Sequence, residues 1–153
     1  MIIRIMQKDA VGNIETPAEF CYSWTGLSKE HSMIHEHESI YQIYLRNFTP
    51  EGTFRAAIPH LPAIAAMGFE WVYLTPIHPI GEKARKGSLG SPYAIKDYRA
   101  INPELGSMAD FQAFIREAHR CGLKVMIDVV YNHTSPDSVL AQEHPDWFLT
   151  GPD

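Results

Sequence analysis

The chain has 153 residues, of which 45% are hydrophobic and 20% are charged, and its formal net charge at pH 7 is -5. This composition is typical of a soluble globular protein, and the negative charge excludes a strongly basic surface for binding nucleic acid. No apolar run reaches the length of a transmembrane helix, and the amino terminus lacks the pattern of a secretory signal, so we expect a cytoplasmic protein. The two cysteines, Cys21 and Cys121, lie far apart and are expected to be free thiols.

Residues 1–39 have mixed polarity without a clear period, and we interpret them as an amino-terminal extension. From Ile40 onward, short apolar runs alternate with amphipathic segments. Residues 40–48 are rich in aromatic and β-branched side chains and lead into Thr-Pro-Glu-Gly, so they are predicted to form a strand that ends near Phe48.

Apolar side chains at helical spacing follow between Phe54 and Gly68. Pro59 and Pro62 exclude an unbroken helix there, because proline lacks the N–H that a helix interior requires, and they predict that a helical turn restarts at a proline. Gly68 suits the left-handed position that ends such a helix. Residues 71–76 are then predicted to form a second buried strand.

The long polar segment 77–105 is too irregular for a helix, and long loops in compact domains tend to be functional. The next helix is predicted to begin after Ser107, which forms a capping-box pattern with Asp110, and to end at Gly122. Its apolar face is expected to carry Met108, Phe111, Phe114, Ile115 and Ala118. Residues 124–131 form a third predicted strand, and this alternation of strands and helices is typical of a parallel sheet.

The third predicted strand carries Asp128 within its apolar run and is followed by Asn132 and His133. A continuous aliphatic run of this kind is typical of a strand covered on both faces, where an ionised aspartate is costly unless it is hydrogen-bonded. Polar side chains at the carboxyl ends of parallel strands form the sites of barrel enzymes. On this stretch alone, two interpretations are equally open: Asp128 and His133 belong to a functional site, or they only hold the following loop against the strand.

Three blocks of sequence, in this order, are similar to those of one enzyme family. They are Trp71-Val-Tyr-Leu-Thr-Pro76, Ser91-Pro-Tyr-Ala-Ile-Lys-Asp-Tyr98 and Asp128-Val-Val-Tyr-Asn-His133. On these blocks the chain resembles the start of the catalytic barrel of the α-amylase family, glycoside hydrolase family thirteen. The resemblance implies that residues 40–136 form the first three βα units of a TIM (β/α)8 barrel, and that residues 137–153 begin the insertion after its third strand.

The resemblance also implies roles for individual residues in binding an α-glucan or maltooligosaccharide. His133 would hydrogen-bond the sugar over the scissile bond, and Tyr93 would stack under the same ring. Asp128 would organise the site, and Asp97 would brace the loop that holds Tyr93. Asn132 would be an oxygen ligand of a structural calcium ion, a cation that prefers such ligands. An aromatic platform with imidazole and carboxamide groups suits a sugar, which has an apolar face and a rim of hydroxyls.

The catalytic carboxylates of this family lie on its fourth and fifth strands, and retaining glycosidases need two carboxyl groups roughly 5 Å apart. A complete barrel takes about 250 residues and eight strands, so this chain has room for about three. We therefore expect an amino-terminal fragment with no catalytic residue, inactive alone, whose open sheet associates with itself or with the remainder of the barrel. In the aromatic block, Ser91 and Pro92 precede Tyr93 where the family commonly has glycine.

Other interpretations of the chain remain open at this point. It could be a non-catalytic glucan-binding or structural remnant that uses the same residues, or a metal-dependent hydrolase with a barrel fold. His31, His35 and His37 could bind a transition metal if they are helical, although a solvated segment is the simpler interpretation. Residues 81–88 superficially resemble a phosphate-binding loop but lack its Gly-Lys-Ser/Thr, so they are either a solvated basic loop or the rim of a sugar cleft.

Overall fold

The computed structural model of the chain describes residues 38–149 and, before them, three two-residue strands. These strands are β1 (Ile2–Ile3), β2 (Gln7–Lys8) and β3 (Ile14–Glu15). β2 pairs with β3, and β1 pairs with β7 (Phe148–Leu149), both in the antiparallel sense. Most of the predicted amino-terminal extension, including Cys21, His31, His35 and His37, lies outside the described residues.

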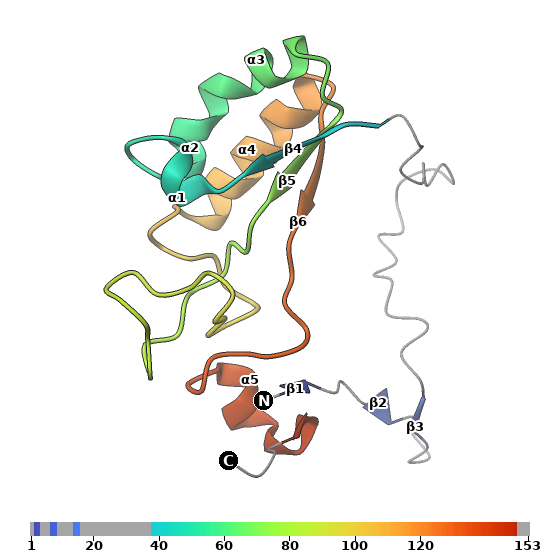
Figure 1. Ribbon diagram of the computed structural model, residues 1–153. Coiled ribbons are helices and arrows are strands. Elements are labelled where there is room, and N and C mark those ends of the chain that lie inside the picture. Colours follow the sequence, from blue (N-terminus) through green and yellow to red (C-terminus); the bar gives the residue numbers. More distant parts are fainter. Residues whose placement is uncertain (1, 4–6, 9–13, 16–37, 150–153) are drawn as a thin grey trace.

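A parallel three-stranded sheet forms the framework of the described residues (Figure 1). Its strands are β4 (Ile40–Ile43), β5 (Trp71–Leu74) and β6 (Lys124–Ile127), in that spatial order. Ile40 lies opposite Trp71, which in turn lies opposite Lys124, so the three strands are in register. This arrangement confirms the predicted partial barrel with parallel strands.

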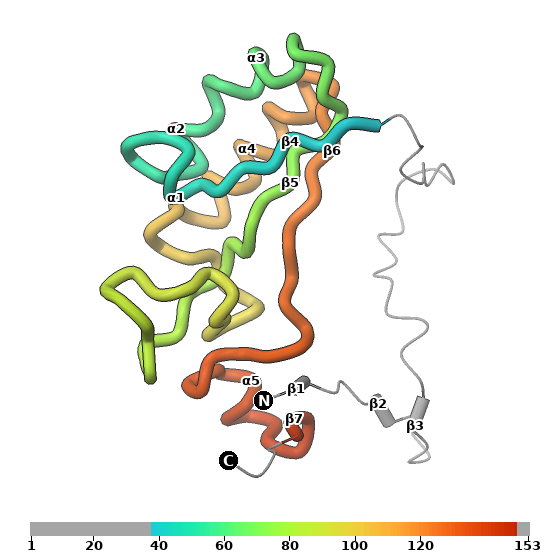
Figure 2. Tube along the Cα trace, viewed as in Figure 1, coloured from blue at the N-terminus to red at the C-terminus, as the bar shows by residue number. Residues whose placement is uncertain are grey.

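Helices connect the strands and cover one face of the sheet. Between β4 and β5 the chain forms α1 (Leu45–Phe48), α2 (Phe54–Ala57), η1 (Ile58–His60) and α3 (Leu61–Ala66). Helix α4 (Met108–Arg120) connects β5 to β6. After β6 come α5 (Val139–Glu143) and η2 (Pro145–Trp147). In Figure 1, α2, α3 and α4 pack together on the same side of the sheet. Figure 2 shows the chain leaving β6 and running past the β5–α4 loop to α5. None of the helices in the described part of the chain has the length and apolar character that a membrane crossing requires.

The interrupted helix between β4 and β5 follows from its sequence. The Thr53 hydroxyl accepts a hydrogen bond from the N–H of Ala56 at 3.2 Å and so caps the start of α2. Pro59 lies in η1 and Pro62 in the first turn of α3, and Gly68 follows the segment with a φ of +89°. The predicted restart at a proline and the predicted glycine cap are both confirmed.

Helix α4 begins and ends where the sequence predicts. Ser107 and Asp110 form the capping box, and Gly122 follows the helix with a φ of +79°. Phe114 and Ala118 are fully buried, whereas Met108 is 49% exposed. The prediction that Met108 lies on the buried face was wrong, because this residue occupies the first position of the helix, before the turns that pack on the core.

Strands β4 and β6 end at Ile43 and Ile127, earlier than the predicted ends near Phe48 and at Tyr131. Both strands border β5, whose sequence leads into Pro76, a residue that has no N–H to continue the ladder. The second predicted strand is shortened for the same reason. Without further pairing, the chain after β4 makes the helical turn α1, and the chain after β6 leaves the sheet.

The main core lies between the helices and the sheet. Ile43, Val72 and Leu74 from the strands meet Phe54 and Phe114 from the helices, and all five side chains are fully buried. Apolar side chains at alternate strand positions therefore anchor the sheet to α2 and α4, and this packing fixes the carboxyl ends of the strands.

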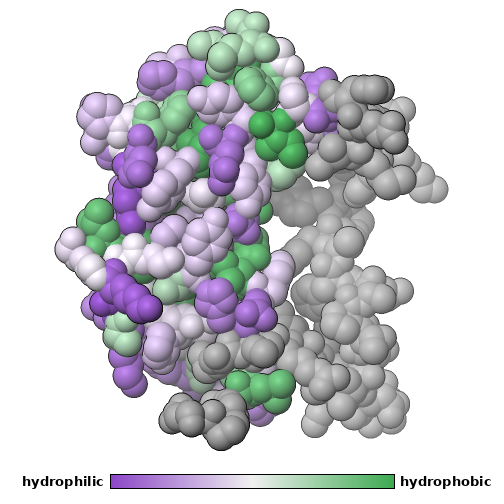
Figure 3. Space-filling model, viewed as in Figure 1, coloured by the Kyte–Doolittle hydropathy of each residue, from purple (hydrophilic) through white to green (hydrophobic). Residues whose placement is uncertain are grey.

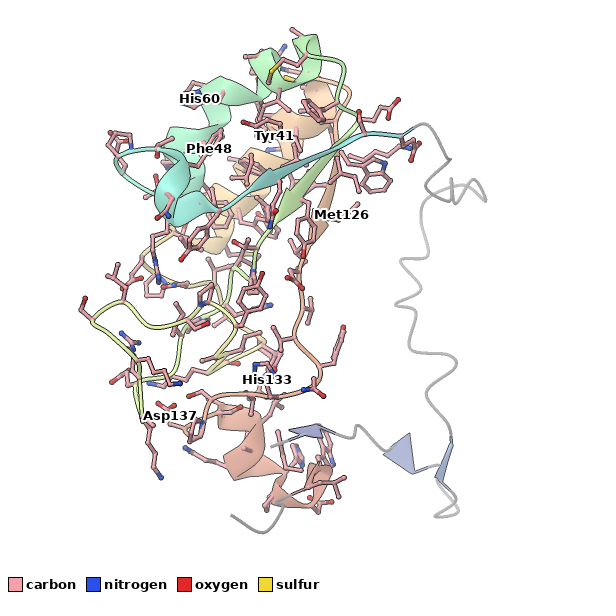
Figure 4. All side chains as sticks on the ribbon, in the orientation of Figure 1. Tyr41, Phe48, His60, Met126, His133 and Asp137 are labelled. Atoms are coloured by element: carbon pink, nitrogen blue, oxygen red, sulfur yellow. The ribbon has the colours of Figure 1, made fainter. Side chains whose placement is uncertain are left out.

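The opposite face of the sheet carries no helix of the described residues (Figure 1). Gln42, Tyr73 and Met126 lie opposite one another across it, and Met126 points away from the helices (Figure 4). Figure 3 shows hydrophobic and hydrophilic residues interspersed over the described surface. Parallel sheets normally have cover on both faces, so this face is incomplete within the described residues.

Candidate functional site

The carboxyl ends of the three strands bring polar side chains to one edge of the sheet. Tyr44 follows β4, Thr75 follows β5 and Asp128 follows β6. The carboxylate of Asp128 accepts a hydrogen bond from the hydroxyl of Tyr73 on the neighbouring strand, and this bond, together with burial and the negative charge, raises the pKa of Tyr73 to about 12. The bond stabilises the neutral phenol, so Tyr73 remains a hydrogen-bond donor near neutral pH.

Tyr93 reaches the same carboxylate from the long loop between β5 and α4. Burial raises the pKa of Tyr93, and the charge of Asp128 and a hydrogen bond to it raise this pKa further. Tyr93 still stays 38% exposed, so it remains accessible to a ligand. The fold therefore brings together two predicted site residues that are distant in sequence. Asp128 itself is half-buried, contrary to the prediction of a buried strand residue, because its face of the sheet lacks cover within the described residues.

An open depression of about 500 Å³ lies beside Tyr93. It is lined by strand-end residues on one wall and by the loop on the other, namely Gln42, Tyr44, Thr75, Ser91, Pro92 and Tyr93. Pro92 and the two tyrosines offer apolar surface, and the remaining side chains offer amide and hydroxyl groups. The depression is therefore both aromatic and rich in hydrogen-bonding groups.

The loop that carries Tyr93 is folded back on itself by its own backbone. Ile80 and Ile95 form an antiparallel bridge, and the N–H of Gly81 donates to the carbonyl of Ala94 at 2.8 Å. Ile80 and Ile95 are also buried, at 7% and 0% exposure. This small hairpin gives Tyr93 a defined position although the loop contains no helix or longer strand.

The basic segment 81–88 belongs to this hairpin. The guanidinium of Arg85 donates to the carbonyls of Gly81 at 2.8 Å and Ile80 at 3.0 Å. Lys96 pairs with Glu82 at 2.7 Å, an exposed ion pair. At least one of the basic side chains therefore holds the loop together, rather than forming the anion-binding turn that leads into a helix in phosphate-binding loops.

His133 lies on the stretch between β6 and α5, beside the β5–α4 loop (Figure 4). Its side chain is exposed, and its backbone is held from the loop. The hydroxyl of Tyr98 donates to the carbonyl of Val130 at 2.7 Å and lies 3.2 Å from that of His133, while the hydroxyl of Thr134 donates to the carbonyl of Ile95 at 2.6 Å. The loop that carries Tyr93 therefore also positions the segment that carries His133.

A tight contact completes the junction between these two segments. A Cβ atom on Gly81 would lie 1.6 Å from the Oγ of Ser135, so no larger residue fits there without movement. Asp137, labelled in Figure 4, accepts hydrogen bonds from Ser135 and from the N–H of Glu82. Burial works against ionisation of Asp137, but hydrogen bonds from Ser135 and from nearby backbone N–H groups outweigh it and lower the pKa of Asp137 to about 2.

Asp97 lies at the turn that follows the hairpin. Its Oδ1 accepts a hydrogen bond from the N–H of Arg99 at 2.9 Å, and Arg99 in turn pairs with Glu143 of α5 at 2.8 Å. Asp97 thus supports the connection from the loop to α5. Its predicted role of bracing Tyr93 stays a prediction.

Asn132 is exposed, and its predicted amide ligand would be only one of the six to eight oxygen ligands that a calcium ion takes. Among residues 38–149 no three histidine, cysteine, aspartate or glutamate side chains gather as a metal site would require. A calcium ion at Asn132 stays a prediction.

Several residues at this edge were not singled out from the sequence. They are Tyr44 and Tyr73 on the strands, Arg46 on α1, and His78, which is 9% exposed and whose Nδ1 lies 3.0 Å from the carbonyl of Ala100. The register of β4 against β5 sets Tyr73 opposite Gln42, and this tertiary pairing, which no local pattern reports, brings Tyr44 and Tyr73 to the same edge of the sheet.

This arrangement is suited to binding a sugar chain. The exposed aromatic side chain of Tyr93 and the surrounding hydroxyl and amide groups match the alternating apolar faces and hydroxyl rims of a sugar chain. The residues that line the depression include no carboxylate, whereas a retaining glycosidase needs two carboxyl groups roughly 5 Å apart.

Comparison with known proteins gives a consistent result. The profile of the alpha-amylase catalytic domain matches residues 16–148. An alpha-1,4-glucan:maltose-1-phosphate maltosyltransferase of Streptomyces coelicolor is 45% identical over 119 residues, covering 69% of this chain and 18% of that protein. The maltosyltransferase of the same name from Methylacidiphilum infernorum is 41% identical over 133 residues, covering 75% of this chain and 20% of that protein.

Solved structures agree with these relatives. An alpha-amylase from Lactobacillus plantarum shares 56% sequence identity and a TM-score of 0.73 over 74% of this chain and 27% of that protein. A maltogenic alpha-amylase from Thermotoga neapolitana shares 40% identity and a TM-score of 0.69 over 73% of this chain and 27% of that protein. The chain thus matches about a fifth of the length of its curated relatives.

Proposed function

The chain belongs to the alpha-amylase family, and we propose that it is the amino-terminal part of a catalytic barrel that acts on α-1,4-glucans as a hydrolase or transglycosylase. The observation that carries this proposal is the meeting of Tyr93 and Asp128 at the carboxyl edge of a parallel sheet. In barrel enzymes this edge holds the active site.

In this proposal the described residues form one wall of the sugar site. Tyr93 is the platform on which a glucose ring stacks, and Asp128 fixes the Tyr93 hydroxyl. His133, held by Tyr98 at the neighbouring segment, hydrogen-bonds the hydroxyls of the same sugar. The aromatic face supplies affinity through apolar contact, and the polar groups fix the orientation of the ring.

Bond cleavage requires groups from the remainder of the barrel. The proposal assigns the nucleophile and the acid/base to carboxylates outside this chain, and it assigns no catalytic residue to the described part. Support comes from the absence of a carboxylate in the lining of the depression and from the small share of the relatives that the chain covers. The chain alone is therefore proposed to bind glucan without turning it over.

The same reasoning identifies a partner for the uncovered face of the sheet. The remainder of the barrel would cover Gln42, Tyr73 and Met126 and would pair with the outer edges of β4 and β6, which have no partner strand within the described residues. When that remainder is absent, a second copy of the chain is the available substitute. A calcium ion at Asn132 stays a prediction, since its other oxygen ligands would come from outside residues 38–149.

Fragment complementation tests the proposal. The pure chain is mixed with a polypeptide that carries the part of the Lactobacillus plantarum amylase following its matching region, and the release of reducing sugar from starch is measured. We expect activity from the mixture and none from either part, with a much weaker signal when the chain carries His133→Ala. Turnover by the chain alone would contradict the proposal. Glucan binding with no activity in any mixture would instead favour the non-catalytic remnant.

A second assay separates hydrolysis from transfer. The active mixture is supplied with maltose-1-phosphate and a glucan acceptor, because relatives of the chain include maltosyltransferases as well as amylases. Growth of the acceptor with release of phosphate indicates a transferase. Shortening of the glucan without any such growth indicates a hydrolase.

A further inference from the structure

Arg46 occupies the first helical turn after β4 and connects two segments that are far apart in sequence. One terminal nitrogen, Nη1, donates to the hydroxyl oxygen of Tyr44 at 3.1 Å and to the carbonyl of Gly90 at 3.1 Å. The other, Nη2, donates to the carbonyl of Leu89 at 3.1 Å and lies 3.6 Å from Glu104. The Arg46 side chain is only 18% exposed, so these contacts are partly shielded from water.

These contacts lie directly behind the depression. Tyr44 belongs to the strand wall, and Gly90 immediately precedes the residues of the loop wall, Ser91, Pro92 and Tyr93. The guanidinium also lies 5.9 Å from the centre of the Tyr44 ring, so it fixes the ring as well as the hydroxyl. The Arg46 side chain thus contacts both the strand wall and the start of the loop wall of the depression.

The loop tip is closely packed at the point that Arg46 holds. Gly90 has a φ of +67°, and a Cβ atom there would lie 2.8 Å from Ile80 and 3.0 Å from Arg85. The tip therefore sits against the hairpin on one side and against Arg46 on the other. A long loop without regular structure is otherwise costly to order when a ligand binds, and prior ordering removes that cost.

We propose that Arg46 is a positioning residue of the glucan groove, which sets the separation of Tyr44 and Tyr93 by holding Tyr44 and the backbone of residues 89–90 together. This inference rests on the proposed glucan site. Because the Tyr44 oxygen accepts from Arg46, its own O–H is available to donate elsewhere, and Tyr44 becomes a second phenol for the ligand in addition to Tyr93.

The chemistry of the contact selects arginine over lysine. A planar guanidinium presents several N–H groups at fixed angles and reaches two carbonyls and a phenol at once, whereas an ammonium on a flexible chain is a point charge. Arg46→Lys keeps the positive charge beside Glu104 but not this geometry. The pair of variants Arg46→Lys and Arg46→Ala therefore separates the role of charge from that of position.

The test uses the full chain, with Arg120→Ala as the matched control, since Arg120 pairs with Glu117 on the exposed side of α4. Two quantities are measured: hydrogen exchange of a peptide that spans residues 86–94, and the dissociation constant for maltoheptaose. We expect Arg46→Ala to speed exchange in that peptide at least tenfold, to leave exchange in α4 unchanged and to weaken maltoheptaose binding at least tenfold. Arg46→Lys should behave like Arg46→Ala, and free guanidinium ion should partly restore binding to Arg46→Ala.

The two readouts distinguish this inference from the proposed function. If the unchanged chain fails to bind maltoheptaose, the proposed function fails, and hydrogen exchange still decides the role of Arg46. Wild-type exchange in residues 86–94 of Arg46→Ala overturns the inference, and so does full recovery of binding by Arg46→Lys. If Arg46→Ala does not fold, Tyr44→Phe provides the test: it removes one partner of Arg46, so it should weaken binding while exchange in the loop stays low. Unchanged binding by Tyr44→Phe would overturn the inference.

Discussion

The side chain of Asp128 raises the pKa of Tyr73 on the neighbouring parallel strand to about 12, through hydrogen bonding and its negative charge, so the two side chains meet at the edge where the chain leaves the sheet. Tyr93 approaches the same carboxylate from the β5–α4 loop. The side chain of Asp128 therefore interacts with one tyrosine from a strand and one from a loop, at the position where barrel enzymes bind their substrates.

The first prediction concerns the ionisation of Tyr73. Asp128→Asn should lower the pKa of Tyr73 from about 12 toward the ordinary value of 10, because the carboxylate both accepts a hydrogen bond from the neutral phenol and opposes a negative phenolate. NMR titration of ring-labelled tyrosine measures the change, and Tyr73→Phe identifies the resonance. A Tyr73 pKa that stays near 12 in Asp128→Asn would show that the carboxylate is not its cause.

The same shift predicts how stability depends on pH. The folded-state pKa of Tyr73 is raised, so the folded state holds the phenol proton more tightly than the unfolded state does. The resulting stabilisation is fully present below pH 10 and is lost as the pH rises toward 12. Urea unfolding across this range should show a steeper loss of stability for the unchanged chain than for Asp128→Asn.

The second prediction concerns the junction between the two loop segments. Gly81→Ala should destabilise the fold by about 3 kcal/mol, because the added methyl would overlap Ser135 and crowd Asp137 in a packed site. Gly87→Ala is the control: nothing lies within 4 Å of its Cβ position, and its positive φ alone should cost about 1 kcal/mol. Equal losses of unfolding free energy in the two variants would mean that Gly81 is not close-packed.

The third prediction concerns the positioning of His133. Tyr98→Phe removes the hydroxyl that donates to the carbonyls of Val130 and His133, so it should cost about 1 kcal/mol of stability and weaken glucan binding. Tyr131→Phe in the same segment should change neither, because Tyr131 is 61% exposed. Calorimetric titration with maltoheptaose and urea unfolding measure both effects. Unchanged glucan binding by Tyr98→Phe would show that Tyr98 does not position His133 for the ligand.

The sequence predicted those elements whose signals are local. Ser107 and Asp110 cap α4, and Gly68 and Gly122 end their helices, because caps and left-handed glycines depend on a few neighbouring residues. The alternation of strands and helices was sufficient to predict the parallel sheet. The structure places Tyr93 and Asp128 at one edge of the sheet, and their roles toward a sugar stay predictions.

The remaining differences arise from tertiary pairing. The aromatic and β-branched residues around Leu45 favour a strand, but β4 ends when its neighbour β5 reaches Pro76. The same pairing places Tyr73 beside Asp128 and Tyr44 at the same edge of the sheet, which no local pattern reports. Arg46 was missed for a related reason, since its partners Leu89 and Gly90 are fixed only by the folded loop.

The fourth prediction concerns the uncovered face of the sheet. The isolated chain should associate with itself, because Ile40 is 44% exposed at the start of β4, and one face and both edges of the sheet lack cover within the described residues. Size-exclusion chromatography with light scattering should show a mass that rises with concentration. Addition of a polypeptide that supplies the remainder of the barrel should replace the self-associated form by a complex of the two. A compact monomer at all concentrations would contradict this prediction.

The central claim is that the chain carries one wall of an α-glucan site without the groups that break the bond. Calorimetric titration of the pure chain with maltoheptaose, followed by analysis of the same sample for reducing sugar, tests it most directly. The account predicts saturable binding that is at least tenfold weaker in Tyr93→Ala and His133→Ala, with no sugar released by any of the three proteins. Absence of binding by the unchanged chain, or turnover by it, would contradict the account.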